Sequence, residues 1–288
     1  MNEYVIFTDS CCDIQPELLK AWGVPYANMT FTFDGEDKAY IDTDISSKEF
    51  YDRMRQGAYA RTAAINADTF TRAFTPILEE GKDILYVAFS SGLSTTVNAA
   101  HMAAEELKEA YPERKILIID TLAASAGGGM MVYMAVAKKN EGASLEENAA
   151  YMESLTPQHC IWFTVDDLEY LKRGGRVSAA TAIVGTMLQI KPVLHVDDEG
   201  HLINVAKTRG RKASIEALAK KVGELGEGFC NDTVFISHGD CREDAEILAS
   251  ILKEQYGVKE VYISYVGAVI GSHSGPGTIA LFFMGKQR

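Results

Sequence analysis

Residues 84–96 read Ile-Leu-Tyr-Val-Ala-Phe-Ser-Ser-Gly-Leu-Ser-Thr-Thr, and this stretch decides the fold. Its six apolar residues predict a strand buried on both faces, and a hydroxyl-rich loop leads from that strand into a predicted helix. Such a loop leaves backbone N–H groups directed at one point, where the helix dipole favours an anion. The stretch therefore predicts a parallel α/β sheet with an anion site at its edge.

The same alternation of strands and helices extends through the first half of the chain. It predicts strands at 4–7, 84–89 and 115–119, a helix opening at Pro16, helices at 46–55, 95–110, 124–139 and 144–155, and a hairpin excursion at about 26–45. Alternation of this kind is typical of right-handed βαβ units, in which helices cover both faces of a parallel sheet.

The second half has a different order of strands and helices, which predicts a mixed sheet. We expect strands at 160–165, 192–196, 201–205, 233–237, 260–266 and 278–284, helices at 211–224 and 241–256, and two short helices around 173–176. The predicted fold class is α/β in two domains. Residues 1–158 would form a three-layer α/β/α domain with a parallel sheet, and residues 159–288 an α/β domain with a mixed sheet.

The composition is that of a soluble globular protein, with 288 residues of which 47% are hydrophobic and 24% charged. A net charge of −12 argues against a nucleic-acid-binding surface. No apolar run is long enough for a membrane span, and the first residues lack signal-peptide features, so we expect a cytoplasmic protein. Five cysteines without a Cys-x-x-Cys pair predict neither disulfides nor a zinc site, and we expect no metal or cofactor.

The candidate binding residues are polar side chains that precede helices, since the chain has no P-loop, no Gly-x-Gly-x-x-Gly and no Gly-x-Ser-x-Gly. Thr62 and Ser94 are the leading candidates, although hydroxyls at such places are often only N-cap residues. Asn66 and Ser125 are further candidates. The three glycines at 127–129 predict either the close approach of a backbone or ligand, or tight helix packing.

Two further segments contribute charged or titratable side chains to the candidate binding residues. Lys172, Arg173 and Arg176 surround two glycines, where an arginine suits carboxylate or phosphate, although cations are also favoured at any helix C-terminus. His273 lies in a glycine-rich loop and is either structural or functional. The apolar stretches 130–137 and 179–188 are typical of core helices, but would also suit the wall of a hydrocarbon slot.

Five segments, taken in order, resemble the DegV family of bacterial fatty-acid-binding proteins. They are residues 8–10, 90–94, 167–176, 191–194 and 273–277, so the resemblance covers essentially the whole chain. It implies two α/β domains with a long-chain fatty acid buried between them.

The resemblance also implies roles for individual residues. The carboxylate-binding hydroxyls of the family correspond to Thr62 and Ser94, and its Arg and His beside the headgroup, implicated in handling acyl phosphate, correspond to Arg173 and His273. The implied protein is a carrier and not an enzyme. It would present the carboxylate to a separate ATP-dependent fatty acid kinase, and the acyl phosphate would serve an acyltransferase of phospholipid synthesis. The alternatives are a lipid-sensing regulatory module, or a stand-alone phosphotransferase or hydrolase using His273 with a serine.

Overall fold

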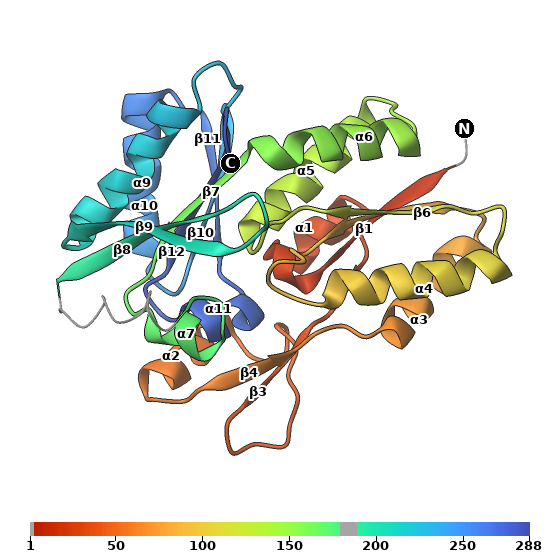
Figure 1. The fold of residues 1–288 in the computed structure, drawn as a ribbon, viewed down its shortest axis with the longest axis horizontal. Coiled ribbons are helices and arrows are strands. Elements are labelled where there is room, and N and C mark those ends of the chain that lie inside the picture. Colours follow the sequence, from red (N-terminus) through yellow and green to blue (C-terminus); the bar gives the residue numbers. More distant parts are fainter. Residues whose placement is uncertain (1–2, 179–188) are drawn as a thin grey trace.

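The first sheet is wholly parallel, as the alternation of strands and helices predicts. In the computed structural model, which describes residues 3–178 and 189–288, its strand order is β2-β1-β5-β6 (Figure 1). The strands are β1 (Tyr4–Asp9), β2 (Tyr26–Ala27), β5 (Asp83–Ala88) and β6 (Ile116–Asp120). Because every adjacent pair is parallel, the carboxyl ends of these strands meet at one edge, which is where open α/β sheets bind ligands.

Helices cover both faces of this sheet. One face packs against α3 (Ala67–Glu79) and α4 (Thr96–Ala110), and the other against α1 (Pro16–Ala21), α5 (Ala126–Asn140) and α6 (Leu145–Leu155). A complete capping box begins α6, because Ser144 and Glu147 each accept a hydrogen bond from the backbone N–H of the other. The predicted three-layer arrangement is confirmed.

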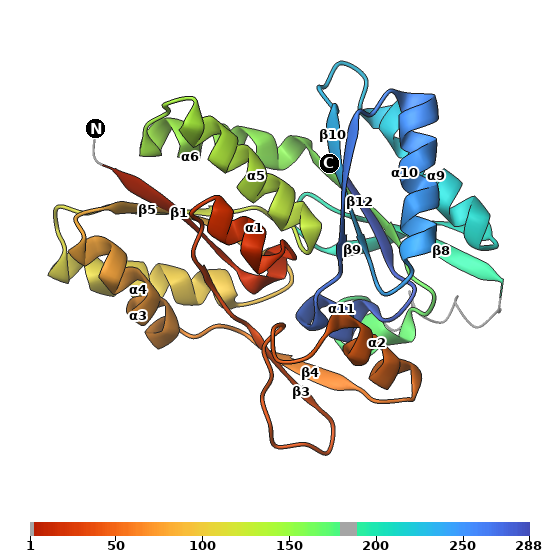
Figure 2. The same cartoon turned by 180° about the vertical axis from the view of Figure 1, so that it is seen from behind.

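The second sheet is mixed, with the strand order β11-β10-β12-β7-β8-β9. Its strands are β7 (His159–Thr164), β8 (Ile190–Val196), β9 (Leu202–Arg209), β10 (Thr233–His238), β11 (Glu260–Tyr265) and β12 (Ile279–Met284). The β10–β11 pair is parallel and the remaining pairs are antiparallel. One face packs against α9 (Arg211–Leu225) and α10 (Arg242–Tyr256), as Figure 2 shows from behind.

Helix α5 lies between the two sheets and packs against both. One apolar core cluster contains Leu85 of the first sheet, Met131 of α5 and Phe282 of the second sheet. The glycines at the start of α5 allow this close approach. A Cβ on Gly127 would lie 2.6 Å from the Phe282 ring, and a Cβ on Gly129 would lie 2.6 Å from a backbone carbonyl oxygen. Tight packing therefore accounts for two of the three glycines.

We expect Gly129→Ala to lower the free energy of unfolding by about 1–3 kcal/mol, because the added methyl group collides with backbone. Gly128→Ala is the matched control, since its Cβ would lie an ordinary 3.5 Å from the nearest atom. Alanine should stabilise the helix there by up to about 1 kcal/mol. Urea unfolding measures both variants, and equal stability of the two would contradict the proposed collision.

The hairpin expected at 26–45 forms only in part. Strand β3 (Thr30–Phe33) pairs with β4 (Ala60–Ala63), a strand that the sequence pattern does not predict. The predicted second arm meets β3 only in an isolated bridge between Phe31 and Tyr40. The helix that follows, α2 (Ser47–Arg55), begins at the predicted cap, where the Ser46 side chain accepts a hydrogen bond from a backbone N–H.

The segment around His273, predicted as a loop, contains the helix α11 (Ala268–Ser274). Asp42, from the excursion, accepts a hydrogen bond of 2.7 Å from the backbone N–H of Ala268, so a residue remote in sequence satisfies the first turn of this helix. The Gly-Pro-Gly turn follows, with φ of 80° at Gly275 and 78° at Gly277.

The remaining short elements are α7 (Glu169–Arg173), which confirms one of the two short helices expected near 173–176, and 3₁₀ turns at Ser10–Cys12 and Thr156–Gln158. The other expected short helix, and the apolar stretch 179–188, lie outside the described residues. Within residues 3–178 and 189–288, no helix combines the length and apolar character that crossing a membrane requires.

Candidate functional site

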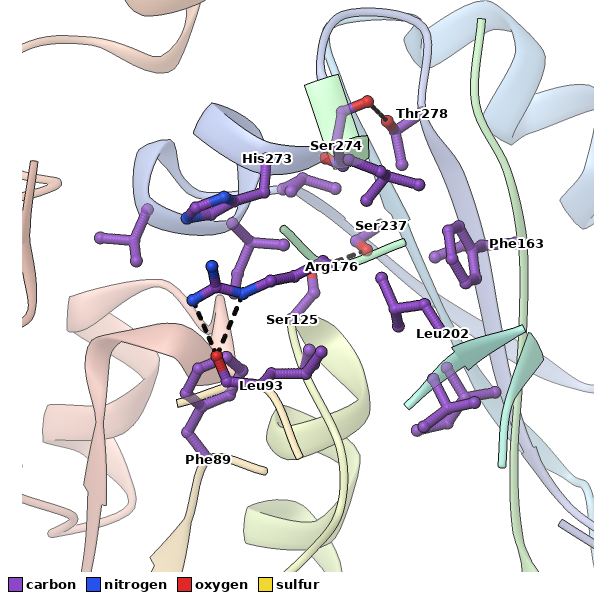
Figure 3. Close-up of a pocket in the computed structure, with 18 of the residues that line it drawn as sticks. Phe89, Leu93, Ser125, Phe163, Arg176, Leu202, Ser237, His273, Ser274 and Thr278 are labelled. Carbon is purple, nitrogen blue, oxygen red and sulfur yellow. Dashed lines mark hydrogen bonds between the residues drawn. The ribbon is translucent and has the colours of Figure 1, made fainter. Parts of the chain in front are cut away.

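An apolar cavity of about 80 Å³ lies between one face of the second sheet and the loops at the carboxyl ends of β5 and β6 (Figure 3). Both halves of the chain contribute to its walls, which include Met29, Phe89, Ile161, Phe163, Leu202 and Phe282. The cavity therefore lies at the edge of the parallel sheet where the sequence predicts a site.

A second, polar pocket of about 380 Å³ adjoins the apolar cavity. Three residues line both spaces: Thr62, Arg176 and His273. We call these three residues the junction. Arg61, Arg173 and Asp34 line the polar pocket only, and Arg61 pairs with Asp34 at 2.9 Å, so side chains of both charges lie on the outer side of the junction.

Thr62 and His273, both predicted site residues, are in direct contact. The Thr62 Oγ1 and His273 Nε2 atoms are 2.8 Å apart. Burial, with a smaller contribution from Arg176, lowers the pKa of His273 to about 4, so the imidazole is neutral near pH 7. The other ring nitrogen packs against Gly174, where any Cβ would collide with it. Gly174, the first glycine of the 172–176 segment, therefore makes room for His273.

Ser94 also lines the apolar cavity, and it has a structural role as well. Its Oγ lies 2.9 Å from the Thr96 Oγ1 atom and accepts a hydrogen bond of 3.2 Å from the Thr96 backbone N–H. The hydroxyl thus satisfies a donor at the first turn of α4 while facing the cavity. Ser94 thus makes a local hydrogen bond of the capping type, one residue before the N-cap Thr95, and its role in binding stays a prediction.

Arg176 is the cation at the junction, whereas the resemblance implies that Arg173 lies beside the headgroup. Its guanidinium donates to the Leu93 carbonyl at 3.2 and 2.9 Å and to the Gly174 carbonyl. It forms no ion pair with any carboxylate in the described part of the chain. Burial lowers its pKa, because its charge lacks an acidic partner. The signal was present, since Arg176 belongs to the same basic segment as Arg173.

Arg173 lies farther out than predicted. Its side chain is exposed, its guanidinium lies 3.6 Å from the centre of the Tyr59 ring, and it pairs with Glu169 at 3.6 Å. It lines the polar pocket and not the apolar cavity. Arg173 can therefore meet a group that extends beyond the junction.

Asn66 lies outside the lining of both spaces. Its exposed side chain caps α3, accepting a hydrogen bond of 2.9 Å from the Thr69 backbone N–H. No contact of this structure supports its predicted ligand role, since the amide oxygen is engaged locally.

Ser125 lines the apolar cavity and donates a hydrogen bond to Asp13. Its Oγ lies 2.8 Å from the Oγ of Ser237, another lining residue that the sequence analysis did not identify. Desolvation by burial, and secondarily the nearby Asp42, raise the pKa of Asp13 well above its usual value, while hydrogen bonds from Ser125 and the Gly267 backbone oppose that shift.

No group of three or more His, Cys, Asp and Glu side chains within the described ranges is arranged to hold a metal ion. The chemistry available at the junction is instead that of hydroxyls, a neutral imidazole and guanidinium groups, which together suit an anion.

The comparisons with known proteins agree with this fold. The chain matches the family described as "Uncharacterised protein, DegV family" over residues 3–286. A DegV domain-containing protein of Clostridium perfringens is 42% identical over 289 aligned residues, which cover 100% of this chain and 99% of that protein. The fatty-acid-binding DegV family protein of Thermus thermophilus is 33% identical, with a TM-score of 0.88 over 99% of this chain and 100% of that one. A stearic-acid-binding protein of Eubacterium ventriosum is 25% identical, with a TM-score of 0.88 over 98% of each chain.

Proposed function

Because this chain belongs to the DegV family, we propose that it binds a long-chain fatty acid, with the carboxylate at the junction and the alkyl chain in the apolar cavity. The observation that carries the proposal is Arg176, a partly buried guanidinium at the end of an apolar cavity, without a carboxylate partner among the described residues. The fatty-acid-binding relatives from Thermus thermophilus and Eubacterium ventriosum support it.

The carboxylate would meet three donor side chains, a guanidinium and two hydroxyls. Arg176 supplies charge, Ser94 supplies a hydroxyl at the start of α4, and Thr62 supplies a second hydroxyl. For Thr62 to donate to the carboxylate, neutral His273 must carry its proton on Nε2 and donate it to the Thr62 oxygen. This tautomer leaves the Thr62 hydroxyl proton for the ligand.

Burial of the alkyl chain would supply most of the affinity. A tail of ~15 carbons at about 0.8 kcal/mol per CH₂ contributes on the order of 12 kcal/mol, and the ordering of the ligand offsets much of it. The cavity volume of about 80 Å³ is room for only a few water molecules. The acid would therefore have to push the apolar side chains apart as it binds.

We also propose a place for the bound acid in a reaction sequence. The polar pocket outside the junction offers the phosphate of an acyl phosphate two guanidinium groups, that of Arg61, which pairs with Asp34, and that of Arg173, which pairs with Glu169. In this proposal, a separate ATP-dependent fatty acid kinase phosphorylates the carboxylate, and an acyltransferase of phospholipid synthesis uses the product. The carrier would act in the cytoplasm, which suits its free cysteines at positions 11, 12, 160, 230 and 241.

The first test is to denature the purified protein, extract it with organic solvent and identify the released lipids by mass spectrometry. We expect a stoichiometric long-chain fatty acid. A clean extract, together with no binding of added palmitate or oleate, would overturn the proposal. Acyl phosphate formed from ATP and palmitate by a purified kinase only when this protein is present would support the carrier role.

The proposed role of the Thr62 and Ser94 hydroxyls gives a prediction that has a matched control. We expect the double variant Thr62→Ala and Ser94→Ala to bind palmitate about thirtyfold more weakly, since each of the two lost hydrogen bonds contributes roughly 1 kcal/mol. Displacement of a fluorescent fatty acid measures this change, and Asn66→Ala, outside the lining, is the control. Unchanged affinity in the double variant would place the carboxylate elsewhere.

A further inference from the structure

The apolar cavity contains a pair of hydroxyls away from the junction. Ser125 and Ser237 both line it, with only 4% and 0% of their surface exposed. In the view of Figure 3 they lie between the guanidinium of Arg176 and the apolar side chains of Phe163 and Leu202. An unsubstituted hydrocarbon offers these hydroxyls no hydrogen-bond partner, so an apolar wall would serve it better.

The backbone at Ser125 is strained in order to hold its hydroxyl there. Its φ of 56° and ψ of −148° lie in a region that glycine adopts freely and other residues adopt at a cost of about 1–3 kcal/mol. Compared with glycine, the serine side chain adds one carbon and a hydroxyl, and the hydroxyl contacts Asp13 and Ser237. The strain therefore points to a need for the hydroxyl group itself.

The number of hydroxyl protons limits the directions of the hydrogen bonds that link Asp13, Ser125 and Ser237. Each serine has one hydroxyl proton. If Asp13 is ionised, Ser125 donates its one proton to Asp13 and cannot also donate to Ser237, whose oxygen stays available as an acceptor. If Asp13 keeps its proton, the direction reverses and Ser237 keeps a proton to donate. Ser237 has no other hydrogen-bond partner among residues 3–178 and 189–288, so in both states it can bond to a ligand.

We propose that Ser125 and Ser237 form a subsite for a hydroxyl group carried part-way along the acyl chain, so that the protein binds hydroxy fatty acids. A ligand hydroxyl both donates and accepts, and it therefore matches Ser237 in either state. The inference rests on the proposed function, because a carboxylate held at the junction determines which carbon of the chain reaches the pair.

The test compares stearic acid with 3-hydroxy-, 10-hydroxy- and 12-hydroxystearic acid by displacement of a fluorescent fatty acid. We expect one of the hydroxy acids to bind about threefold to tenfold more tightly than stearic acid, the worth of one hydrogen bond. Ser237→Ala should reverse this preference, because the ligand hydroxyl would then be buried without a partner. Ser237→Cys, which keeps the volume and bonds weakly, should remove the preference as well.

Ser264→Ala is the matched control. Ser264 lies opposite Ser237 in the β10–β11 register, is 5% exposed and has no hydrogen-bond partner in the described part of the chain, but it does not line the apolar cavity. It should keep the wild-type preference. Weaker binding of every hydroxy acid than of stearic acid, or a preference that persists in both Ser237 variants, would overturn the subsite. Failure of stearic acid itself to bind would overturn the proposed function instead.

Discussion

The Arg176→Gln variant is expected to bind palmitate about tenfold to a hundredfold more weakly than the wild-type protein. Arg176 donates only to backbone carbonyls in this structure, and burial lowers the pKa of its guanidinium. An incoming carboxylate supplies the missing counter-charge, and hydrogen bonds between charged groups contribute about 1.5–3 kcal/mol. Calorimetric titration with palmitate measures the loss.

Two controls distinguish the loss of the Arg176 charge from a general disturbance of the site. Arg173→Gln removes a nearby but exposed arginine that lines only the polar pocket, and we expect less than about a threefold change. Methyl palmitate lacks the negative charge, so its binding should be almost insensitive to Arg176→Gln. Equal losses for palmitate and its methyl ester would mean that Arg176 shapes the cavity and does not bind the carboxylate.

The second large effect concerns the stability of the protein below pH 6.5. His159 is fully buried, packs near the ring of Phe282, and neither ring nitrogen has a hydrogen-bond partner within the described residues. Burial, with a smaller contribution from Arg288, lowers its pKa from 6.5 to about 3. Below pH 6.5 the unfolded chain binds a proton that the folded protein resists, so the free energy of unfolding falls by up to about 1.4 kcal/mol per pH unit.

We expect His159→Phe to remove this component of the pH dependence. The variant should be about 1–3 kcal/mol more stable at pH 7.5, since it no longer buries unpaired ring nitrogens. Its advantage should grow by about 2 kcal/mol between pH 6.5 and pH 5. Urea unfolding at these pH values gives the difference between the two proteins. A difference that stays constant with pH would show that His159 protonates in the folded protein.

The elements that the sequence predicts well are those with strong local signals. The strand expected at 115–119 is β6 (Ile116–Asp120), and the helix expected at 211–224 is α9 (Arg211–Leu225). Helix α11 was missed because glycine and serine weaken its local signal, while Asp42, more than two hundred residues earlier, satisfies its first turn. Strand β4 was missed for a similar reason, since its partner β3 lies about thirty residues away.

The sequence also predicts part of the site. Ser94 lines the cavity because its loop follows the carboxyl end of the parallel strand β5, whereas Thr62 reaches the cavity from β4, which pairs antiparallel with β3. Which arginine of the 172–176 segment turns inward depends on Gly175, whose φ of 68° redirects the chain after α7. Asn66 carries the ordinary signal of an N-cap residue, and the structure shows that role.

The apolar core that includes α5 affects how the protein unfolds. The proposed division at residues 158 and 159 separates the two sheets along the chain, yet side chains from both sheets belong to the same core cluster. Because neither half can expose that core without exposing part of the other, we expect the two halves to unfold together. A ligand bound between them would consequently raise the melting temperature of the whole chain in a single transition.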